Sequence, residues 1–304
     1  MAPVISIIIC TFNRFQDLEL ALKSLKDQKF EKNNFEILIV DAGSTDKISE
    51  IIDRFSIFLQ IRFFSVPHLG LSEARNFGIR NASCDIIAFL DDDAIADPAW
   101  LEQIQTSFRE HGMCACGGKS ILLYDTPLPH WLNNRMLGLL GQFDYGTTGF
   151  FLDTPDKNPA GLNMAFMKKT FYLIGYFNPD LGRSGGNLLS NEEVDLFQKI
   201  RRKNLKIYYN PKMLVYHHVN IERTTKEYFY KRYYWQGRSD AVINLNDFSF
   251  KGILKILFRI IIIPFRPFKV YFFSQFNSIE QKQIVFRCTM EYDRGYLHQV
   301  VNIF

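Results

Sequence analysis

Short aliphatic runs alternate with segments of helical spacing over the first third of the 304-residue chain, and this alternation limits the fold more than any other feature. The runs are rich in isoleucine and phenylalanine, and the segments between them repeat apolar residues at intervals of three and four. A strand followed by a helix, repeated at this rhythm, predicts an α/β fold with a mostly parallel sheet and helices on both of its faces. The expected strands occupy residues 5–10, 35–40, 61–66 and 86–90.

Polar side chains follow three of these expected strands. Thr11 ends the first strand, Asp41 ends the second, and the aspartates Asp91, Asp92 and Asp93 follow the fourth. Because an open sheet of this kind binds ligands at the carboxyl ends of its strands, these side chains are expected to converge on one site. No GxGxxG follows the first strand, which disfavours a dinucleotide site.

The sequence pattern changes twice along the chain, and we predict three parts. Residues 1–115 form an α/β half, and 116–222 form the second half of the same domain, with loops rich in proline and glycine that suit a binding surface. Residues 223–304 regain helical spacing and are rich in aromatic and basic side chains. We expect this third part to be a helical C-terminal extension.

Charge and composition exclude several classes of protein. A net charge of +4 and a pI near 8.7 are too mild for a dedicated nucleic-acid binder, so no nucleic-acid partner is expected. Five cysteines without a CxxC pair predict a reducing, cytoplasmic location. The sequence has no signal-peptide pattern, and no uncharged apolar stretch reaches the roughly 18 residues of a membrane-spanning helix.

The three consecutive aspartates at 91–93 suggest a cation site. At an effective dielectric constant near 20, each close pair of carboxylates costs up to about 4 kcal/mol without a counterion. Mg²⁺ and Mn²⁺ prefer such oxygen ligands and usually share their coordination shell with substrate phosphates. The alternative is that the three aspartates lie on a solvated turn ahead of a helix that Asp97 caps.

Four segments resemble glycosyltransferase family 2 in their order and spacing: residues 7–14 (IIICTFNR), 40–46 (VDAGSTD), 70–76 (GLSEARN) and 90–93 (LDDD). The resemblance continues through 161–166 (GLNMAF), 189–196 (LSNEEVDL) and 215–218 (VYHH). It implies the GT-A fold and a metal-dependent, inverting glycosyltransferase, with 1–115 as the nucleotide-sugar-binding half and 116–222 as the acceptor-binding and catalytic-base half. The donor would be a nucleoside-diphosphate sugar, by default a UDP-sugar. The acceptor would be a hydroxyl of a glycan or lipid-linked molecule in cell-surface polysaccharide or glycoconjugate synthesis.

The resemblance also implies how the donor is bound. Asp41 would accept a hydrogen bond from the base, and Arg75 would approach the diphosphate. Asp91 and Asp92 would contact the ribose or the metal and its waters, and Asp93 would bind Mn²⁺ or Mg²⁺ directly. The other nucleotide contacts would come from Thr11, Phe12 and Asn13. Ala42 stands where the family often has a second aspartate, so no contact from that carboxylate is expected.

The same resemblance places a metal-binding histidine and a general base. His217 would complete the metal's coordination, with its neighbour His218 as the alternative. The family's base is the second acid of a pair, which implies Glu193. Glutamate replaces the family's usual aspartate there, and Glu192 is therefore an alternative. On the residues alone, these acids have a second interpretation, in which they complement the positive end of a helix dipole.

Contacts to the acceptor or the sugar are implied for Trp131, Asn163, Glu192 and Asp195. For Trp131 the alternative is packing into a loop core, because an amphipathic aromatic side chain suits both places.

The C-terminal part combines aromatic, aliphatic and basic residues. Segments 228–239 and 253–276 both have this composition, and prolines at 264 and 267 interrupt the second. This favours a peripheral enzyme on the cytoplasmic face of a membrane, acting on a lipid-linked acceptor. The alternative is that these segments pack on the catalytic domain or form the interface of a homo-oligomer.

Two other functions are alternatives. A sugar nucleotidyltransferase would need a glycine-rich, basic loop after the first strand, which residues 11–14 do not supply. A non-catalytic module that binds sugar nucleotides or glycans would not need the acids at 91–93 and 193. Processive synthases carry a QxxRW motif that this sequence lacks, so transfer of a single sugar is expected.

Overall fold

The structure is a computed structural model that describes residues 4–45, 47–246, 250–273, 276 and 278–302. It divides into two compact units, and each is described by itself. The sheet unit comprises Met1–Leu123, Gly141–Pro179 and Glu192–His218. The helical unit comprises Tyr124–Leu140, Asp180–Asn191 and Val219–Phe304. The segments 124–140 and 180–191 thus join the C-terminal helices, which a division at residues 115 and 222 does not anticipate.

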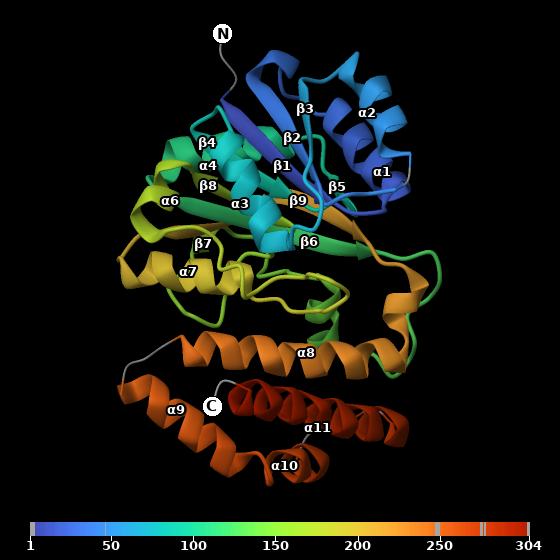
Figure 1. The fold of residues 1–304 in the computed structure, drawn as a ribbon, viewed down its shortest axis with the longest axis vertical. Helices are drawn as coiled ribbons and strands as arrows, with labels where there is room; N and C mark the ends of the chain where they lie inside the picture. Colours follow the sequence, from blue (N-terminus) through green and yellow to red (C-terminus); the bar gives the residue numbers. More distant parts are fainter. Residues whose placement is uncertain (1–3, 46, 247–249, 274–275, 277, 303–304) are drawn as a thin grey trace. The chain divides into compact units, whose positions relative to one another are not determined.

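One mixed sheet forms the centre of the sheet unit (Figure 1). Its first four strands are parallel, in the order β3-β2-β1-β4. They are β1 (Ile5–Thr11), β2 (Phe35–Asp41), β3 (Ile61–Ser65) and β4 (Ile86–Leu90). The predicted strands and their parallel arrangement are therefore confirmed for this half of the sheet.

The other strands mix both directions, because loops rather than crossover helices connect several of them. β8 (Asn163–Met167) runs antiparallel between β4 and β6 (Ala115–Leu123). β9 (Ile207–His218) is parallel to β6 and antiparallel to β5 (Ala94–Ala96) and β7 (Phe150–Phe151). The residues after 115 therefore extend the first half's sheet and do not form a separate one.

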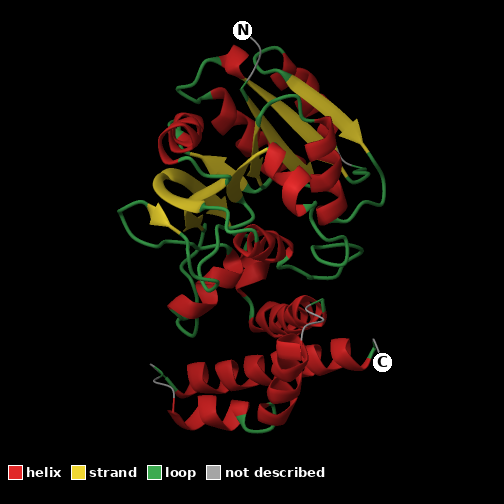
Figure 2. Cartoon of the chain, turned by 90° about the vertical axis from the view of Figure 1, so that its left-hand side faces the viewer, coloured by secondary structure: helices red, strands yellow, loops and turns green. Residues whose placement is uncertain are grey.

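Helices cover both faces of this sheet, as Figure 2 shows. On one face, α1 (Phe15–Lys26), α2 (Ile48–Ser56) and α4 (Trp100–His111) share one hydrophobic core with alternate residues of β1. On the other face lie α3 (Leu71–Asn81), α6 (Lys169–Ile174) and α7 (Glu192–Arg202). Ile7 and Ile8 of β1 belong to the two different cores. The period-2 pattern of the strand thus feeds both layers. Asp46, a candidate helix cap in the sequence, lies outside the described residues.

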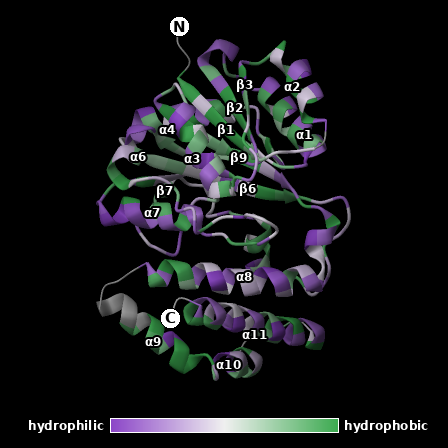
Figure 3. Ribbon diagram, viewed as in Figure 1, coloured by the Kyte–Doolittle hydropathy of each residue, from purple (hydrophilic) through white to green (hydrophobic). Residues whose placement is uncertain are grey.

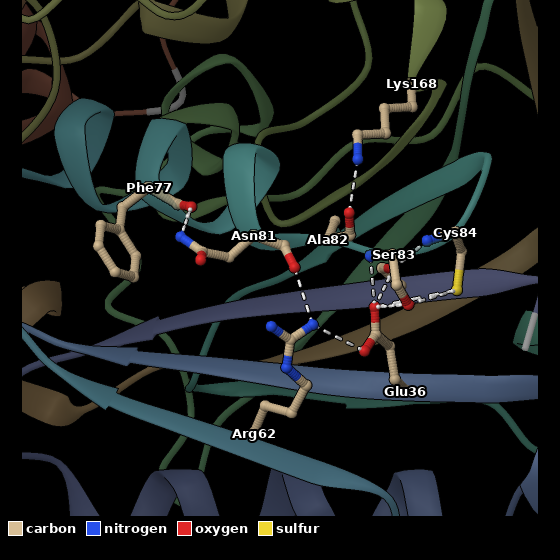
Figure 4. A network of polar contacts seen from close by, with 9 residues as sticks. Glu36, Arg62, Phe77, Asn81, Ala82, Ser83, Cys84 and Lys168 are labelled. Carbon is tan, nitrogen blue, oxygen red and sulfur yellow. Dashed lines mark hydrogen bonds and ion pairs between the residues drawn. The ribbon is translucent and has the colours of Figure 1, made fainter.

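The edge of the sheet away from the carboxyl ends is tied together by the buried Glu36 (Figure 4). Its Oε1 accepts hydrogen bonds from Ser6 Oγ at 2.6 Å and from both the backbone N and Oγ of Ser83 at 2.7 Å. Arg62 Nη1 donates to Glu36 Oε2 at 3.1 Å. Burial acts to raise the pKa of Glu36, but these hydrogen bonds outweigh it and hold the pKa below its ordinary value.

The helical unit is built on two long parallel helices, α8 (Lys226–Leu245) and α11 (Ile279–Val301), whose contacts run in step from Lys226–Glu280 to Arg238–Gln299. Glycines let their backbones approach closely: a Cβ at Gly237 would lie 2.0 Å from the carbonyl oxygen of Tyr292. Two shorter helices, α9 (Phe250–Ile262) and α10 (Arg266–Phe273), and the short α5 (Asn134–Leu137) complete it. Among the described helices, none combines the length and hydrophobicity that crossing a membrane requires.

The two C-terminal segments with mixed composition have different environments. Segment 228–239 lies within α8, where Phe229, Arg232, Gly237 and Ser239 are buried. The alternative of packing within the protein therefore holds for α8. Segment 253–276 covers α9 and α10, which expose many large apolar side chains. Residues 274 and 275 of this segment, and the side chains of Ile253, Lys255 and Phe273, lie outside the described part.

Candidate active site

The carboxyl ends of β1, β2 and β4 meet at one edge of the sheet, as the sequence predicts. Thr11 and Asp41 are paired in register at the ends of β1 and β2, and Asp91 follows the last residue of β4. Thr11 Oγ1 donates a hydrogen bond of 2.8 Å to Asp92 Oδ2. Thr11 therefore orients Asp92 of the triplet. Its hydroxyl proton is used in this hydrogen bond.

Asp41 organises the loop that follows β2. Its carboxylate accepts hydrogen bonds from the backbone N of Gly43 at 3.3 Å and of Ser44 at 3.0 Å, and from the hydroxyl groups of Ser44 and Ser65. The side chain is buried. The Asp41 carboxylate is thus held in a fixed orientation. A nucleotide base that bound there would donate to an oxygen that already accepts hydrogen bonds from the protein.

Asn13 and Phe12 shape the loop after β1. Asn13 Oδ1 accepts a hydrogen bond of 2.9 Å from the backbone N of Thr45, and the Asn13 backbone N donates to Ser44 Oγ at 2.8 Å. Asn13 has a φ of 54°, in the left-handed region that asparagine tolerates. These bonds tie the loops after β1 and β2 together. Phe12 beside them is 55% exposed, so its ring is open for stacking.

Arg14 contacts two of the three aspartates. Its Nη1 lies 3.2 Å from Asp92 Oδ1 and 2.8 Å from Asp93 Oδ2. Arg14 immediately precedes α1, and this position directs its side chain back toward the end of β4. Arg14 ends the motif at residues 7–14, and neither that motif nor the family resemblance predicts a role for it. The available sequence signal was a basic residue three positions after Thr11, close to the predicted acidic site.

Electrostatics at the triplet reflect burial and crowding. Burial is the largest cause that raises the pKa of Asp92, to about 7, and the carboxylates of Asp93 and Asp91 act in the same direction. Arg14 and the hydroxyl of Thr11 act against this rise. The carboxylates of Asp92, Asp93 and Asp17 raise the pKa of Arg14 against the effect of its own burial. Positive charge is therefore what this cluster needs most.

His217 faces Asp93 from the neighbouring part of the sheet. His217 Nε2 lies 3.0 Å from Asp93 Oδ1, and both side chains are buried. The pairing of β5 with β9 sets this distance, since Ala94 and His217 are partners in register. His218 points elsewhere, with its Nδ1 3.7 Å from Asp17 Oδ1 in α1. Of the two histidines, the structure brings His217 to the triplet.

The donor set at Asp93 suits a cation whose coordination substrate completes. One carboxylate and one imidazole face each other there, and Mg²⁺ or Mn²⁺ sites commonly add phosphate oxygens and water to so few protein ligands. Within the described ranges, no group of three or more His, Cys, Asp or Glu residues is arranged to hold a metal by itself. Asp91, predicted as a further ligand, instead pairs with Arg75 at 3.1 Å.

Arg75 connects the triplet to the start of α7. It lies in α3 with 2% of its surface exposed, and its Nη1 lies 2.5 Å from Glu192 Oε1. Its Nη2 donates to the Gly161 carbonyl oxygen at 3.3 Å, in addition to the contact with Asp91. The guanidinium also lies over the ring of Phe177, 5.5 Å from its centroid. Arg75 is thus a buried hub beside the expected diphosphate position, with carboxylates on two sides.

The two glutamates at the start of α7 have different environments. Glu192 is buried in the pair with Arg75, and its Oε2 has no hydrogen-bond partner among the residues described. Glu193 is half-buried, and its carboxyl carbon lies 3.7 Å from where a Cβ at Gly161 would stand. Glu193 therefore borders the hub without forming its central ion pair. Asp195 lies 2.8 Å from Lys199 along α7, an ordinary i,i+4 pair.

Two residues predicted near the sugar are engaged elsewhere. Asn163 is completely buried, and its amide accepts from Trp100 Nε1 at 2.9 Å and donates to the carbonyl oxygens of Lys119 and Met213. Its side-chain amide is therefore fully engaged inside the sheet unit. Trp131 lies buried in the helical unit, edge-on to Phe229 at 5.3 Å between ring centroids. This matches the alternative of packing into a core.

Comparison with known proteins identifies what this chain is similar to. The model of the family described as "Glycosyl transferase family 2" matches residues 6–172. A glucosyl-dolichyl phosphate glucuronosyltransferase of Haloferax volcanii is 24% identical over 246 residues, which cover 79% of this chain and 77% of that protein.

Solved structures share the fold. A mannosyltransferase from Pyrobaculum calidifontis, in complex with GDP-Man and Mn²⁺, matches with a TM-score of 0.64 at 13% identity, over 99% of this chain and 88% of the other. S. aureus TarS 1–349 in complex with UDP-GlcNAc matches with a TM-score of 0.56 at 17% identity, over 99% of this chain and 92% of the other.

Proposed function

The chain belongs to glycosyl transferase family 2 and is a glycosyltransferase with the GT-A fold; from this premise, we propose that it transfers one sugar from a nucleoside-diphosphate donor to an acceptor hydroxyl, with inversion at the anomeric carbon. The observation that carries the proposal is the position of Arg75. Its guanidinium bridges Asp91 at the end of β4 and Glu192 at the start of α7. One acid of the donor side and the first acid of the pair on the acceptor side are thereby joined through one guanidinium.

The donor that we propose is a UDP-sugar. Phe12 offers an exposed ring for stacking, and the fixed carboxylate of Asp41 suits an N–H donor on the edge of a base. The TarS structure with UDP-GlcNAc supports uridine, whereas the mannosyltransferase structure holds GDP-Man. The test below therefore includes both nucleotides.

A divalent cation is part of the proposal, with Asp93 and His217 as its protein ligands. Bound there, it would supply positive charge to the leaving diphosphate. Arg14 contacts Asp93 and Arg75 contacts Asp91, so both add positive charge to the triplet. The hydrogen bond from Thr11 fixes the orientation of the Asp92 carboxylate. The Mn²⁺ in the mannosyltransferase structure supports this assignment.

Glu193 is the general base that we propose. As the acceptor oxygen forms its bond to the anomeric carbon, the bond from that carbon to the diphosphate oxygen breaks, and the hydroxyl proton passes to the Glu193 carboxylate. The half-buried side chain of Glu193 reaches solvent, whereas the Glu192 carboxylate is committed to Arg75. Glu192 therefore acts as a positioning residue in this scheme.

A glycan or a lipid-linked sugar is the proposed acceptor class. The name of the Haloferax volcanii relative describes transfer of glucuronate to a glucosyl-dolichyl phosphate, and that relative matches over most of both chains. This supports an acceptor hydroxyl on a sugar that a lipid carries, and a role in the synthesis of cell-surface glycans.

Release of nucleoside diphosphate from purified protein tests the proposal. UDP-, GDP- and dTDP-sugars are each incubated with and without Mn²⁺, and with a panel of sugar and lipid-linked sugar acceptors. We expect release from one nucleotide class, dependent on Mn²⁺ and increased by acceptor. Tight donor binding without release under all conditions would instead indicate a non-catalytic binding module.

A further inference from the structure

The helices α9 and α10 of the helical unit, with the turn between them, carry a series of exposed, large apolar side chains. Between 51% and 70% of each of these side chains is accessible, which is unusual for so many neighbours along one segment. Figure 3 shows the hydrophobic colouring of the described part of α9. The residues that matter most are Leu257, Phe258, Ile261, Phe265, Phe268 and Phe272.

The inner side of the same segment is already satisfied by the helical unit. Ile256 and Ile263 pack against the core that contains Ala241 and Tyr296. Arg266 lies 3.1 Å from the buried Asp293, and the guanidinium of Arg259 lies over the Tyr296 ring at 4.9 Å from its centroid. The exposed apolar side chains therefore form a second face, which the unit's own folding does not require.

Charge identifies what fits this face. Residues 250–273 contain five basic residues and no acidic residue. Two of them have acidic partners, because Arg266 pairs with Asp293 and Arg259 lies 3.8 Å from Asp240. Five positive charges less these two negative charges leave the segment with a net charge of +3. Two copies of this face placed together would bring like charges into contact, which opposes self-association. An anionic surface with an apolar interior complements both the charge and the hydrophobic side chains.

We propose that the exposed face of α9 and α10 inserts into the headgroup region of an anionic lipid bilayer. The 13 residues of α9 rise to only about 20 Å, well below the roughly 30 Å hydrocarbon core, so the helix lies in the interface. The aromatic rings of Phe258, Phe265 and Phe268 enter the boundary with the acyl chains, while the exposed Lys269 stays at the phosphate level. The surface thereby holds the enzyme at a membrane independently of its donor and acceptor.

Flotation of the full chain with vesicles tests this surface without relying on catalysis. We expect the protein to float with vesicles of phosphatidylcholine mixed with phosphatidylglycerol, to float poorly with phosphatidylcholine alone, and to be released at high salt. The double variant Phe258→Ser/Phe265→Ser should lose at least about tenfold in bound fraction. Lys269→Glu should weaken binding to the anionic vesicles alone.

Controls separate this surface from general stickiness and from misfolding. Ile57→Ser removes a side chain that is 78% exposed in the sheet unit and should leave flotation unchanged. Each variant should keep the thermal midpoint and the donor binding of the parent protein. Protein that stays at the bottom with both kinds of vesicle would overturn the proposal. So would a stable dimer that Phe258→Ser/Phe265→Ser dissociates, since the occupant would then be a second copy.

Discussion

Arg14 Nη1 lies 2.8 Å from Asp93 Oδ2, and His217 contacts the other oxygen of the same carboxylate, Oδ1. The same nitrogen lies 3.2 Å from Asp92, so one guanidinium contacts two neighbouring carboxylates and offsets only part of their charge. Any divalent cation that binds Asp93 therefore acts on a carboxylate already supplied with positive charge. Substitution of Arg14 therefore tests how much of the charge compensation at Asp93 comes from the guanidinium and how much from a bound metal ion.

Arg14→Ala should make the protein depend more on metal for stability. Without the guanidinium the two buried carboxylates lose a partner, and we expect a loss of about 1–2 kcal/mol, reduced because Arg14 is about a third exposed. Saturating Mn²⁺ should restore more stability to the variant than to the parent. Thermal unfolding with and without Mn²⁺ measures this. Arg54→Ala, which removes a surface pair with Glu19, is the control and should show no such difference. Equal restoration in all three proteins would contradict the expectation.

Glu193→Gln and Glu192→Gln should fail in different ways. Loss of a general base lowers kcat by about 100-fold to 10,000-fold while donor binding is kept, and we expect this for Glu193→Gln. Glu192→Gln removes the charge partner of the buried Arg75, so unfolding should become easier by about 3 kcal/mol. Donor binding by calorimetry, the turnover rate and the thermal midpoint are measured for both variants. If Glu192→Gln kept full stability and lost turnover instead, the two roles would be exchanged.

His217→Ala should weaken metal binding, because its Nε2 faces Asp93 at 3.0 Å. We expect the Kd for Mn²⁺ in the presence of nucleoside diphosphate to rise by about tenfold or more, as with loss of a ligand. Electron paramagnetic resonance of free Mn²⁺ gives the Kd directly. The adjacent His218→Ala is a matched control, since that imidazole lies toward Asp17 and should leave the Kd unchanged.

Glu36 should make stability depend on pH without affecting the active site. Its pKa in the folded state lies below the ordinary value, so the folded protein binds fewer protons there than the unfolded chain. The stabilisation is therefore present above pH of about 4.5 and is lost as the pH falls through the lower, folded pKa. Glu36→Gln should lower stability at pH 7 by about 1–3 kcal/mol. This difference from the parent should shrink below a pH of about 4, as urea unfolding at several pH values would show. A constant difference at all pH values would exclude this linkage.

Local patterns were enough to predict the first half of the sheet and its functional edge. The strands ending at Thr11, Asp41 and Leu90 follow from short aliphatic runs, and the helices between them from apolar residues at intervals of three and four. Parallel order then places the polar residues after these strands at one edge. The resemblance to a known family extended this to the acid pair at the start of α7.

Other features required the tertiary structure, because they depend on which distant segments become neighbours. Arg75 and Glu192 are 117 positions apart, and no local pattern announces their ion pair. The pairing of β5 with β9 decides that His217 and not His218 meets Asp93. Burial of Asn163 among three partners likewise removes it from the predicted sugar contacts.

The sequence by itself thus determined where strands and helices form, and which edge of the sheet carries the acids, since backbone periodicity and side-chain hydrophobicity are local properties. Only the tertiary structure decided how those acids are neutralised. The interaction of Arg14 with Asp93, and of Arg75 with Glu192, depends on distances of a few ångströms between elements far apart in the chain. Coulomb energies change steeply over such distances, whereas the sequence pattern does not register them at all.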